Sequence, residues 1–301
     1  FEKILKFCAT TLKDYKVRHS IQTNLTLIDK GFVDLFKLYD VSVGFSLDGD
    51  RQLNDITRVG IDGTGTFKLI EKKIELCRKN NLKIAAIVVL TEANKNHIKR
   101  IYEYFVANNL NFKLNPVFNF GSAEGCYDKI GISVDDYASA MNQLFDLWID
   151  DPNTKIEISN LKEIASNIIT RKPSLCTFKK NCQFHFISIA PTGDVYPCGR
   201  FHAETKYVIG NIAKTSITKL LNIKKNTDLQ NRHTYIEDSE CSTCKYLDIC
   251  HGGCVHDAIT YNATPLSKTG LCSAYKKIFS HIEMALQKRM PATKTNPIRI
   301  D

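Results

Sequence analysis

Cysteine spacing is the feature that most constrains what this chain can fold into. Eight of its eleven cysteines fall between residues 176 and 272. Their spacing is Cys176-x5-Cys182-x15-Cys198, then Cys241-x2-Cys244-x5-Cys250-x3-Cys254, then Cys272. A Cys-x2-Cys pair places two thiolates on one short turn, which is a common way to chelate a metal. Eight thiols in this segment are enough for two metal centres with four thiolates each.

Three interpretations of these cysteines are open. No secretory signal is visible, so reduced ligands are favoured over disulfides. Two structural zinc sites remain possible, because Cys-x2-Cys is also zinc spacing. Sites of four thiolates suit [4Fe–4S] clusters, which we favour. The other cysteines, Cys8, Cys77 and Cys126, have no ligand spacing and are expected to be packing residues or free thiols.

Composition excludes some classes of protein. An apolar fraction of 43% and a charged fraction of 24% are those of a soluble globular protein. No apolar run approaches the roughly 18 residues that a membrane helix needs. The net charge of +9 indicates a lysine-rich surface, and nucleic acid is not expected as a partner because no basic block is interleaved with aromatic residues. A cytoplasmic location is expected.

The first half of the chain alternates between predicted helices and strands. The predicted strands cover residues 17–22, 41–47, 82–90 and 112–117. The predicted helices cover residues 1–14, 30–39, 66–81, 97–108, 134–149 and 158–170. This rhythm indicates parallel βαβ units, and therefore an α/β barrel or an open α/β sheet.

Small polar residues follow the predicted strands, where active sites of parallel sheets lie. They are Thr23 and Asn24, Ser46 and Asp48, Thr91, and Asn115. A glycine-rich phosphate loop is absent from the sequence.

The second half of the chain does not continue this alternation of helices and strands. Residues 184–190 and 195–198 are predicted to form a β-hairpin with its turn at Gly193, which would bring Cys182 near Cys198. Gly252 and Gly253 fall where the chain would pass close to a metal centre. A last helix is predicted over residues 274–288.

The cysteine pattern resembles the seven-cysteine signature of SPASM domains in radical S-adenosylmethionine (SAM) peptide-modifying enzymes. Cys176 adds the eighth cysteine of anaerobic sulfatase-maturating enzymes and their relatives. Upstream, residues 22–27, QTNLTL, resemble the family's QTNGTL strand end. Residues 46–49, SLDG, followed by Arg58, resemble its SLDG…R segment. The resemblance extends to about residue 285.

This resemblance implies a fold, a domain division and a set of cluster ligands. Residues 1–171 would form a partial radical SAM (β/α) barrel, residues 172–290 a SPASM domain of a β-hairpin plus helices, and residues 291–301 a tail. The first auxiliary [4Fe–4S] cluster would use Cys176, Cys182, Cys198 and Cys254. The second would use Cys241, Cys244, Cys250 and Cys272. Four thiolates on each cluster leave no iron open, which favours electron transfer or a structural role.

The resemblance also implies a reaction. The intact enzyme would modify a peptide or protein by hydrogen abstraction with a 5′-deoxyadenosyl radical, using electrons from a donor such as a flavodoxin or ferredoxin. A third cluster is implied in that enzyme. Residues expected to help hold SAM are Thr23, Asn24, Ser46, Asp48 and Arg58. No general base can be assigned, and Asp194 and His202 near Cys198 are expected to be turn or surface residues.

Two departures from the family pattern shape the prediction. The CxxxCxxC loop that holds the SAM-cleaving cluster is missing, as is the GGEP segment, and the chain starts with Phe1. We therefore expect an N-terminal truncation that removes the first two strands and leaves this polypeptide inactive alone. Gly199 stands where sulfatase-maturating enzymes carry a catalytic aspartate. A thioether or carbon–carbon crosslink is therefore expected rather than formylglycine.

An alternative belongs to a different class. The chain could be a non-catalytic iron–sulfur or zinc protein, either an electron carrier or an interaction module, with a degenerate barrel.

Overall fold

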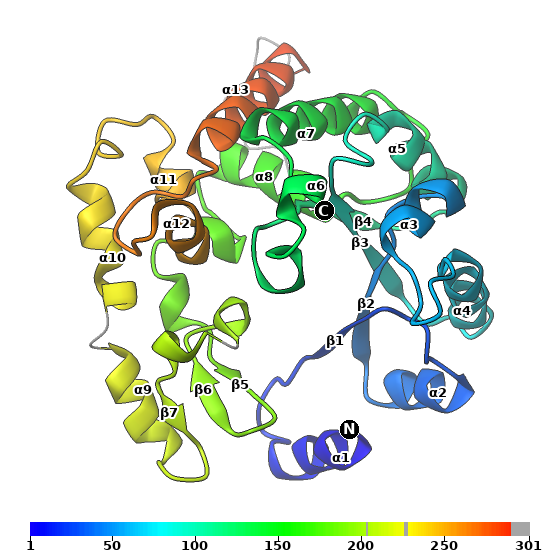
Figure 1. Ribbon diagram of the computed structural model, residues 1–301, viewed down its shortest axis with the longest axis horizontal. Coiled ribbons are helices and arrows are strands. Elements are labelled where there is room, and N and C mark those ends of the chain that lie inside the picture. Colours follow the sequence, from blue (N-terminus) through cyan, green and yellow to red (C-terminus); the bar gives the residue numbers. More distant parts are fainter. Residues whose placement is uncertain (203, 226–227, 290–301) are drawn as a thin grey trace. The chain divides into compact units, whose positions relative to one another are not determined.

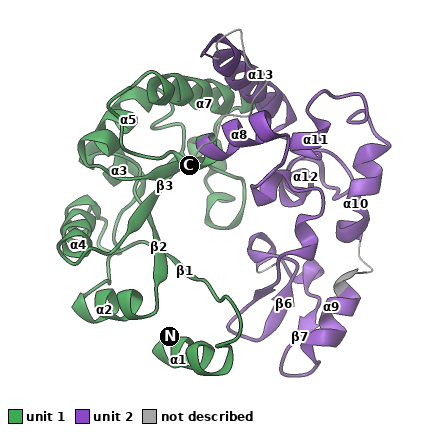
Figure 2. Cartoon of the chain, turned by 180° about the vertical axis from the view of Figure 1, so that it is seen from behind, with its two compact units in different colours: residues 1–161 green, residues 162–301 purple. Residues whose placement is uncertain are grey.

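A computed structural model describes residues 1–202, 204–225 and 228–289 (Figure 1). The chain divides into two compact units, Phe1–Leu161 and Lys162–Asp301 (Figure 2). This division falls within helix α8 (Ser159–Thr170), ahead of the predicted boundary between residues 171 and 172. The predicted tail, residues 291–301, lies outside the described residues.

The first unit is built on a parallel sheet of four strands in the order β1-β2-β3-β4. The strands are β1 (His19–Thr23), β2 (Val41–Ser46), β3 (Ile84–Leu90) and β4 (Phe112–Pro116). In the register of the sheet, Thr23 pairs with Phe45 and Ser46 pairs with Ile87. The carboxyl ends of β1, β2 and β3 therefore lie at one edge, and the predicted α/β class is confirmed.

Helices alternate with these strands. They are α1 (Glu2–Thr11), α2 (Lys30–Leu38), α3 (Arg51–Thr57), α4 (Phe67–Lys79), α5 (Ile98–Ala107), α6 (Tyr127–Ile130), α7 (Val134–Ile149) and α8. Figure 1 shows α2, α4 and α5 on one side of the sheet. Helix α3 was not predicted, because Asp48-Gly49-Asp50 looks like a simple turn. Instead Asp50 caps α3, and its carboxylate accepts hydrogen bonds from the backbone N–H groups of Gln52 and Leu53.

The core of this unit lies between the helices and one face of the sheet. Alternate strand residues such as Val43, Phe45, Val88 and Leu114 are buried. Helix α1 differs, because its apolar residues are mostly exposed and Leu5 is the buried one.

The cysteines of this unit differ in burial. Cys77 is buried in α4, as expected for a packing residue. Cys8 and Cys126 are only partly buried.

The outer edge of β4 is covered by the segment that leads into α8. The backbone N–H of Phe112 donates to the carbonyl of Glu157. The Asn160 amide then bonds the backbone of Leu114 on both sides, donating to its carbonyl at 2.8 Å and accepting from its N–H at 3.4 Å. One side chain thus supplies the pair of hydrogen bonds that a neighbouring strand would make.

The second unit combines a small antiparallel sheet with helices. Its strands are β5 (Ser188–Ile189), β6 (Asp194–Tyr196) and β7 (Gly210–Asn211), in the order β5-β6-β7. Its helices after α8 are α9 (Ile217–Lys225), α10 (Asp228–Glu237), α11 (Leu247–Cys250), α12 (Val255–Asn262) and α13 (Cys272–Arg289).

The predicted hairpin is confirmed between β5 and β6, and its first strand is shorter than expected. Gly193 occupies the turn with φ +86°, and its N–H donates to the carbonyl of Ala190. Strand structure was predicted from residue 184, and that part is wrong. Cys182–Phe184 form a 3₁₀ turn, in which the His185 N–H bonds the Cys182 carbonyl and cannot join a ladder.

None of the described helices combines the length and apolar character needed to cross a membrane.

Candidate metal centres

Four cysteines of the second unit line one cavity. They are Cys241, Cys244, Cys250 and Cys272. The cavity is small, with about 20 Å³ of room for the centre of a water molecule. A tight turn presents the first pair, because the Cys244 N–H donates to the carbonyl of Cys241 at 3.0 Å. Cys250 is the last residue of α11 and Cys272 is the first of α13, so two helix ends bring the other thiols to the same space.

The environment of these thiols penalises negative charge in the absence of a metal. Burial raises the pKa of Cys250 to about 12, and the neighbouring thiols of Cys272, Cys241 and Cys244 add to this effect. Burial also raises the pKa of Cys272, with further contributions from Cys241 and Cys244. Four thiolates gathered in a poorly solvated cavity need a positive centre to offset them.

The other four cysteines form a second group around α12 and the hairpin. Burial raises the pKa of the Cys182 thiol, and Cys176 and Cys198 contribute, so these three thiols lie within electrostatic reach of one another. This supports the prediction that the hairpin brings Cys182 near Cys198. Burial raises the pKa of Cys254 to about 12. Arg200, two residues after Cys198, places its Nη1 at 3.4 Å from the Cys254 sulfur and so links Cys254 to the hairpin.

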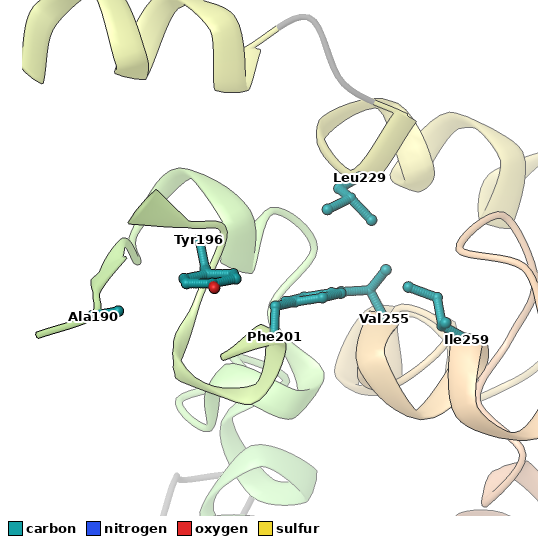
Figure 3. Close-up of a cluster of buried hydrophobic side chains, with 6 residues drawn as sticks. All are labelled: Ala190, Tyr196, Phe201, Leu229, Val255 and Ile259. Carbon is teal, nitrogen blue, oxygen red and sulfur yellow. The ribbon is translucent and has the colours of Figure 1, made fainter. Parts of the chain in front are cut away.

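A hydrophobic cluster holds this group in place (Figure 3). Its residues are Ala190, Tyr196, Phe201, Leu229, Val255 and Ile259. The Cys198 side chain packs against the cluster, and Cys254 immediately precedes its member Val255 at the start of α12. Packing between the hairpin and α12 therefore fixes two of the thiols relative to each other.

The two glycines between Cys250 and Cys254 have positive φ angles, +76° at Gly252 and +71° at Gly253. A Cβ atom at Gly252 would lie 2.6 Å from Ile236, and one at Gly253 would lie 2.4 Å from Thr269. Both conditions favour glycine. The side chains that a Cβ atom would meet are those of Ile236 and Thr269.

A site of four thiolates can hold either a single zinc ion or an iron–sulfur cluster. Within the described ranges, no group of three or more His, Cys, Asp or Glu side chains is placed to hold a metal ion. A structural zinc ion would draw four sulfurs to about 2.3 Å from one centre. A four-iron cluster would take its four thiolates from the residues that line this cavity, Cys241, Cys244, Cys250 and Cys272.

The structure brings together two of the residues expected to hold SAM. Asp48 is 2% exposed and pairs with Arg58 through Nη2 at 2.9 Å and Nε at 2.7 Å. The same carboxylate accepts from the backbone N–H of Val89 at 2.8 Å and from the Thr57 hydroxyl at 3.2 Å. Through these contacts the Asp48 carboxylate joins the end of β2 to α3 and β3.

The other three expected residues lie at the carboxyl ends of β1 and β2. Thr23 accepts a hydrogen bond from the Leu25 N–H, and Asn24 accepts from the N–H and hydroxyl of Thr26. Ser46 is the last residue of β2 and is partly buried. Thr23 and Asn24 therefore shape the turn after β1.

The two residues considered near Cys198 have the predicted roles. Asp194 accepts from Asn211 at 2.9 Å and from Thr192 at 2.7 Å, which lowers its pKa. It stabilises the hairpin turn. His202 is exposed, with its ring 5.5 Å from that of Tyr196.

Two arginines near the thiols were not predicted, the partly exposed Arg200 and the buried Arg232. Arg200 forms an ion pair with Asp257 besides its contact to Cys254. Arg232 lies in α10, a helix whose polar sequence carries few apolar residues. No spacing rule points to a lone arginine, so sequence reasoning had no signal for either.

The chain is similar in sequence to a known domain family and to several curated proteins. Residues 176–245 match the SPASM family model, described as an iron-sulfur cluster-binding domain. A cysteine-type anaerobic sulfatase-maturating enzyme of Clostridium perfringens strain 13 is 28% identical over 281 residues, 89% of this chain and 73% of that protein. A serine-type enzyme of Bacteroides thetaiotaomicron is 21% identical over 300 residues, 94% of this chain and 72% of that protein.

Solved structures share the fold. The structure titled native anSMEcpe with bound AdoMet matches with a TM-score of 0.80 and 24% identity, covering 96% of this chain and 80% of that one. Streptococcus suis SuiB bound to S-adenosylmethionine matches with a TM-score of 0.56 and 18% identity, covering 90% of this chain and 62% of that one.

The match of residues 176–245 indicates an iron–sulfur cluster-binding domain, and the solved structures show a radical SAM type of fold. The chain is similar to radical SAM/SPASM oxidoreductases, and sulfatase-maturating enzymes are among its relatives.

Proposed function

We propose that this chain holds two auxiliary [4Fe–4S] clusters in an enzyme that modifies a peptide or protein. The observation that carries the proposal is the single cavity lined by Cys241, Cys244, Cys250 and Cys272. Electrostatic coupling and packing support a first set of Cys176, Cys182, Cys198 and Cys254. The shared cavity supports a second set of Cys241, Cys244, Cys250 and Cys272. These are the ligand sets expected from the family resemblance.

SAM and its cluster, when bound, would supply a 5′-deoxyadenosyl radical for hydrogen abstraction, while the auxiliary clusters would supply electron transfer. The residues of this chain have three tasks. The eight cysteines fill the coordination of both auxiliary clusters. Thr23 and Ser46 lie at the sheet edge where parallel folds bind ligands. The Asp48–Arg58 pair holds that edge rigid by joining β2 to β3.

We propose crosslinking of the peptide, through a thioether or carbon–carbon bond, as the reaction. Gly199 supports this choice, since it follows Cys198 and offers no carboxylate there. Formylglycine formation is the second candidate, and the names of the relatives favour it. Mass spectrometry of a cysteine-containing peptide treated with the full-length gene product distinguishes them. Crosslinking removes two hydrogens and keeps the sulfur, whereas formylglycine formation replaces the sulfur with oxygen. Sulfur loss would overturn the crosslinking proposal.

The partners proposed are a peptide substrate and an electron donor such as a flavodoxin or ferredoxin. Solved relatives with bound peptides, titled Kp18Cys and Cp18Cys, support the first. The net charge of +9 supports an acidic donor, because opposite charge speeds association.

Anaerobic reconstitution of the chain with iron and sulfide tests the two-cluster proposal. Two clusters require about eight irons and eight sulfides per chain. Cys198→Ser and Cys244→Ser should each lower the iron content by about half, because each removes a ligand from one set only. Cys126→Ser is the matched control and should leave the content unchanged, since its partly buried thiol lies outside both sets. Stoichiometric zinc without sulfide would reject the proposal in favour of the non-catalytic zinc alternative.

A further inference from the structure

Arg232 is a buried cation whose described hydrogen bonds all go to neutral groups. Its side chain lies in α10, and the residue is 7% exposed. Nη1 donates to the carbonyl of Gly253 at 2.9 Å, and Nη2 donates to that of Gly252 at 2.8 Å. Nε and Nη2 donate to the carbonyl of Ser267 at 3.2 and 2.8 Å. Asp257 lies within its electrostatic field, yet that carboxylate forms its ion pair with Arg200.

The charge of Arg232 acts on thiols of both sets. The thiols that raise the pKa of Arg232 most are Cys254 and Cys182 of the first set and Cys250 and Cys241 of the second. Two other cations are more selective. Arg200 acts on Cys254 of the first set. Lys268 acts on Cys272 and Cys241 of the second.

Hydrogen bonds to neutral carbonyls do not fully offset the free-energy cost of burying a charged side chain. Moving an unpaired guanidinium out of water costs several kcal/mol, and carbonyl dipoles recover part of this. A cluster site with four thiolates is anionic, and it becomes more so on reduction. A positive charge close to two such sites would be stabilised by both, and it would favour the reduced state of each.

We propose that Arg232 is a shared counter-charge that sets the reduction potentials of both auxiliary clusters. It is a positioning residue, because it touches neither substrate nor iron. This inference rests on the proposed division of the eight cysteines into two clusters. The bonds from Arg232 to Gly252, Gly253 and Ser267 fix its charge beside the loop that joins the two sets.

The test is a redox titration of the reconstituted chain, with each cluster followed by electron paramagnetic resonance. Arg232→Gln should shift both midpoint potentials to lower values, because the reduced clusters lose a favourable charge. Arg232→Lys keeps the charge and should shift them much less. Arg200→Gln and Lys268→Gln are matched controls: the first should move only the first cluster's potential, and the second only the other's.

Two outcomes would overturn the proposal. One is a Gln variant in which neither potential, or only one, moves. The other is equal loss of iron from the Gln and Lys variants, which would make Arg232 a clamp for the carbonyls of Gly252 and Gly253. The iron and sulfide content of the unsubstituted chain is measured first. A content well below two clusters would contradict the two-cluster proposal itself. This result is distinct from a failure of the Arg232 proposal, which would appear only in the variants.

Discussion

Asp48 and Arg58 form a two-pronged ion pair at the end of β2, with nitrogen–oxygen distances of 2.9 and 2.7 Å. The carboxylate is buried, and it also receives the N–H of Val89 on the neighbouring strand. The pair therefore fixes the chain after β2 against β3. The pair lies in the SLDG…R segment, which was expected to help hold SAM. Its contacts in the structure hold the end of β2 against β3.

Asp48→Asn should destabilise the first unit by about 3–5 kcal/mol, because Arg58 would lose its partner in a poorly solvated position. Trp148 is the only tryptophan of the chain and lies in α7, so its fluorescence during urea unfolding reports on this unit. Thr57→Val removes only the longer 3.2 Å contact and should cost about 1 kcal/mol. Equal costs for the two variants would show that the ion pair contributes little.

The N-terminus of α7 should show a pH-dependent stability. Ser133 and Asp136 form a capping box, and the hydrogen bond from Ser133 lowers the pKa of Asp136 below its usual 3.8. The carboxylate therefore stabilises the fold above pH 3.8, and this contribution is lost as the pH falls through the lowered value.

Ser133→Ala should cost about 1 kcal/mol at pH 7, and the difference from the parent chain should narrow below about pH 4. Urea unfolding followed through Trp148 at both pH values measures this. Ser139→Ala, at an exposed position in the middle of the same helix, should cost nothing at either pH. A constant cost across the pH range would exclude a contribution from the Asp136 carboxylate.

Gly253→Ala should impair cluster assembly, because the new methyl group would meet Thr269 at 2.4 Å and force apart the loop between Cys250 and Cys254. Iron content after reconstitution should fall well below that of the parent. Gly121→Ala is the control, since Gly121 also has positive φ but has open space around it. It should cost about 1–2 kcal/mol of stability and leave the iron content unchanged. Normal iron content in Gly253→Ala would contradict the tight fit described here.

At Leu25, substitution by glycine should cost less stability than substitution by alanine, which is the reverse of the usual order. It is fully buried, yet its backbone has φ +67°, at the position of the glycine in the family's QTNGTL segment. Leu25→Ala should cost about 2–5 kcal/mol, because it empties a core position and keeps the backbone strain. Leu25→Gly should cost about 1 kcal/mol less than that, because it relieves the strain. Trp148 fluorescence again measures both, and a more costly glycine would mean that the strain is negligible.

The parts of the fold that could be predicted are those with dense local signals. Residues 82–90 are an almost continuous apolar run and were predicted as a strand, and β3 covers Ile84–Leu90 of that run. The cysteine spacing indicated metal ligands in the segment that matches the iron-sulfur cluster-binding model, because ligand spacing reflects local chelation. Helix α10 was missed, since Leu229 and Ile236 are its only strongly apolar buried positions. The location of Arg232 depends on three carbonyls from distant segments, and such long-range contacts leave no pattern in the neighbouring residues.

The Asn160 side chain that bonds both backbone groups of Leu114 has a consequence for how the sheet can grow. Exposed strand edges are templates for pairing with other chains, and aggregation often begins there. Asn160 and the segment before it occupy the β4 side of the sheet, so a stray strand has no free ladder to join on that side. Among the described strands, β1 is the other border of the sheet. Extension of the sheet, by this polypeptide or another, is therefore directed to β1, and Asn160→Ala should make the chain more prone to self-association through β4.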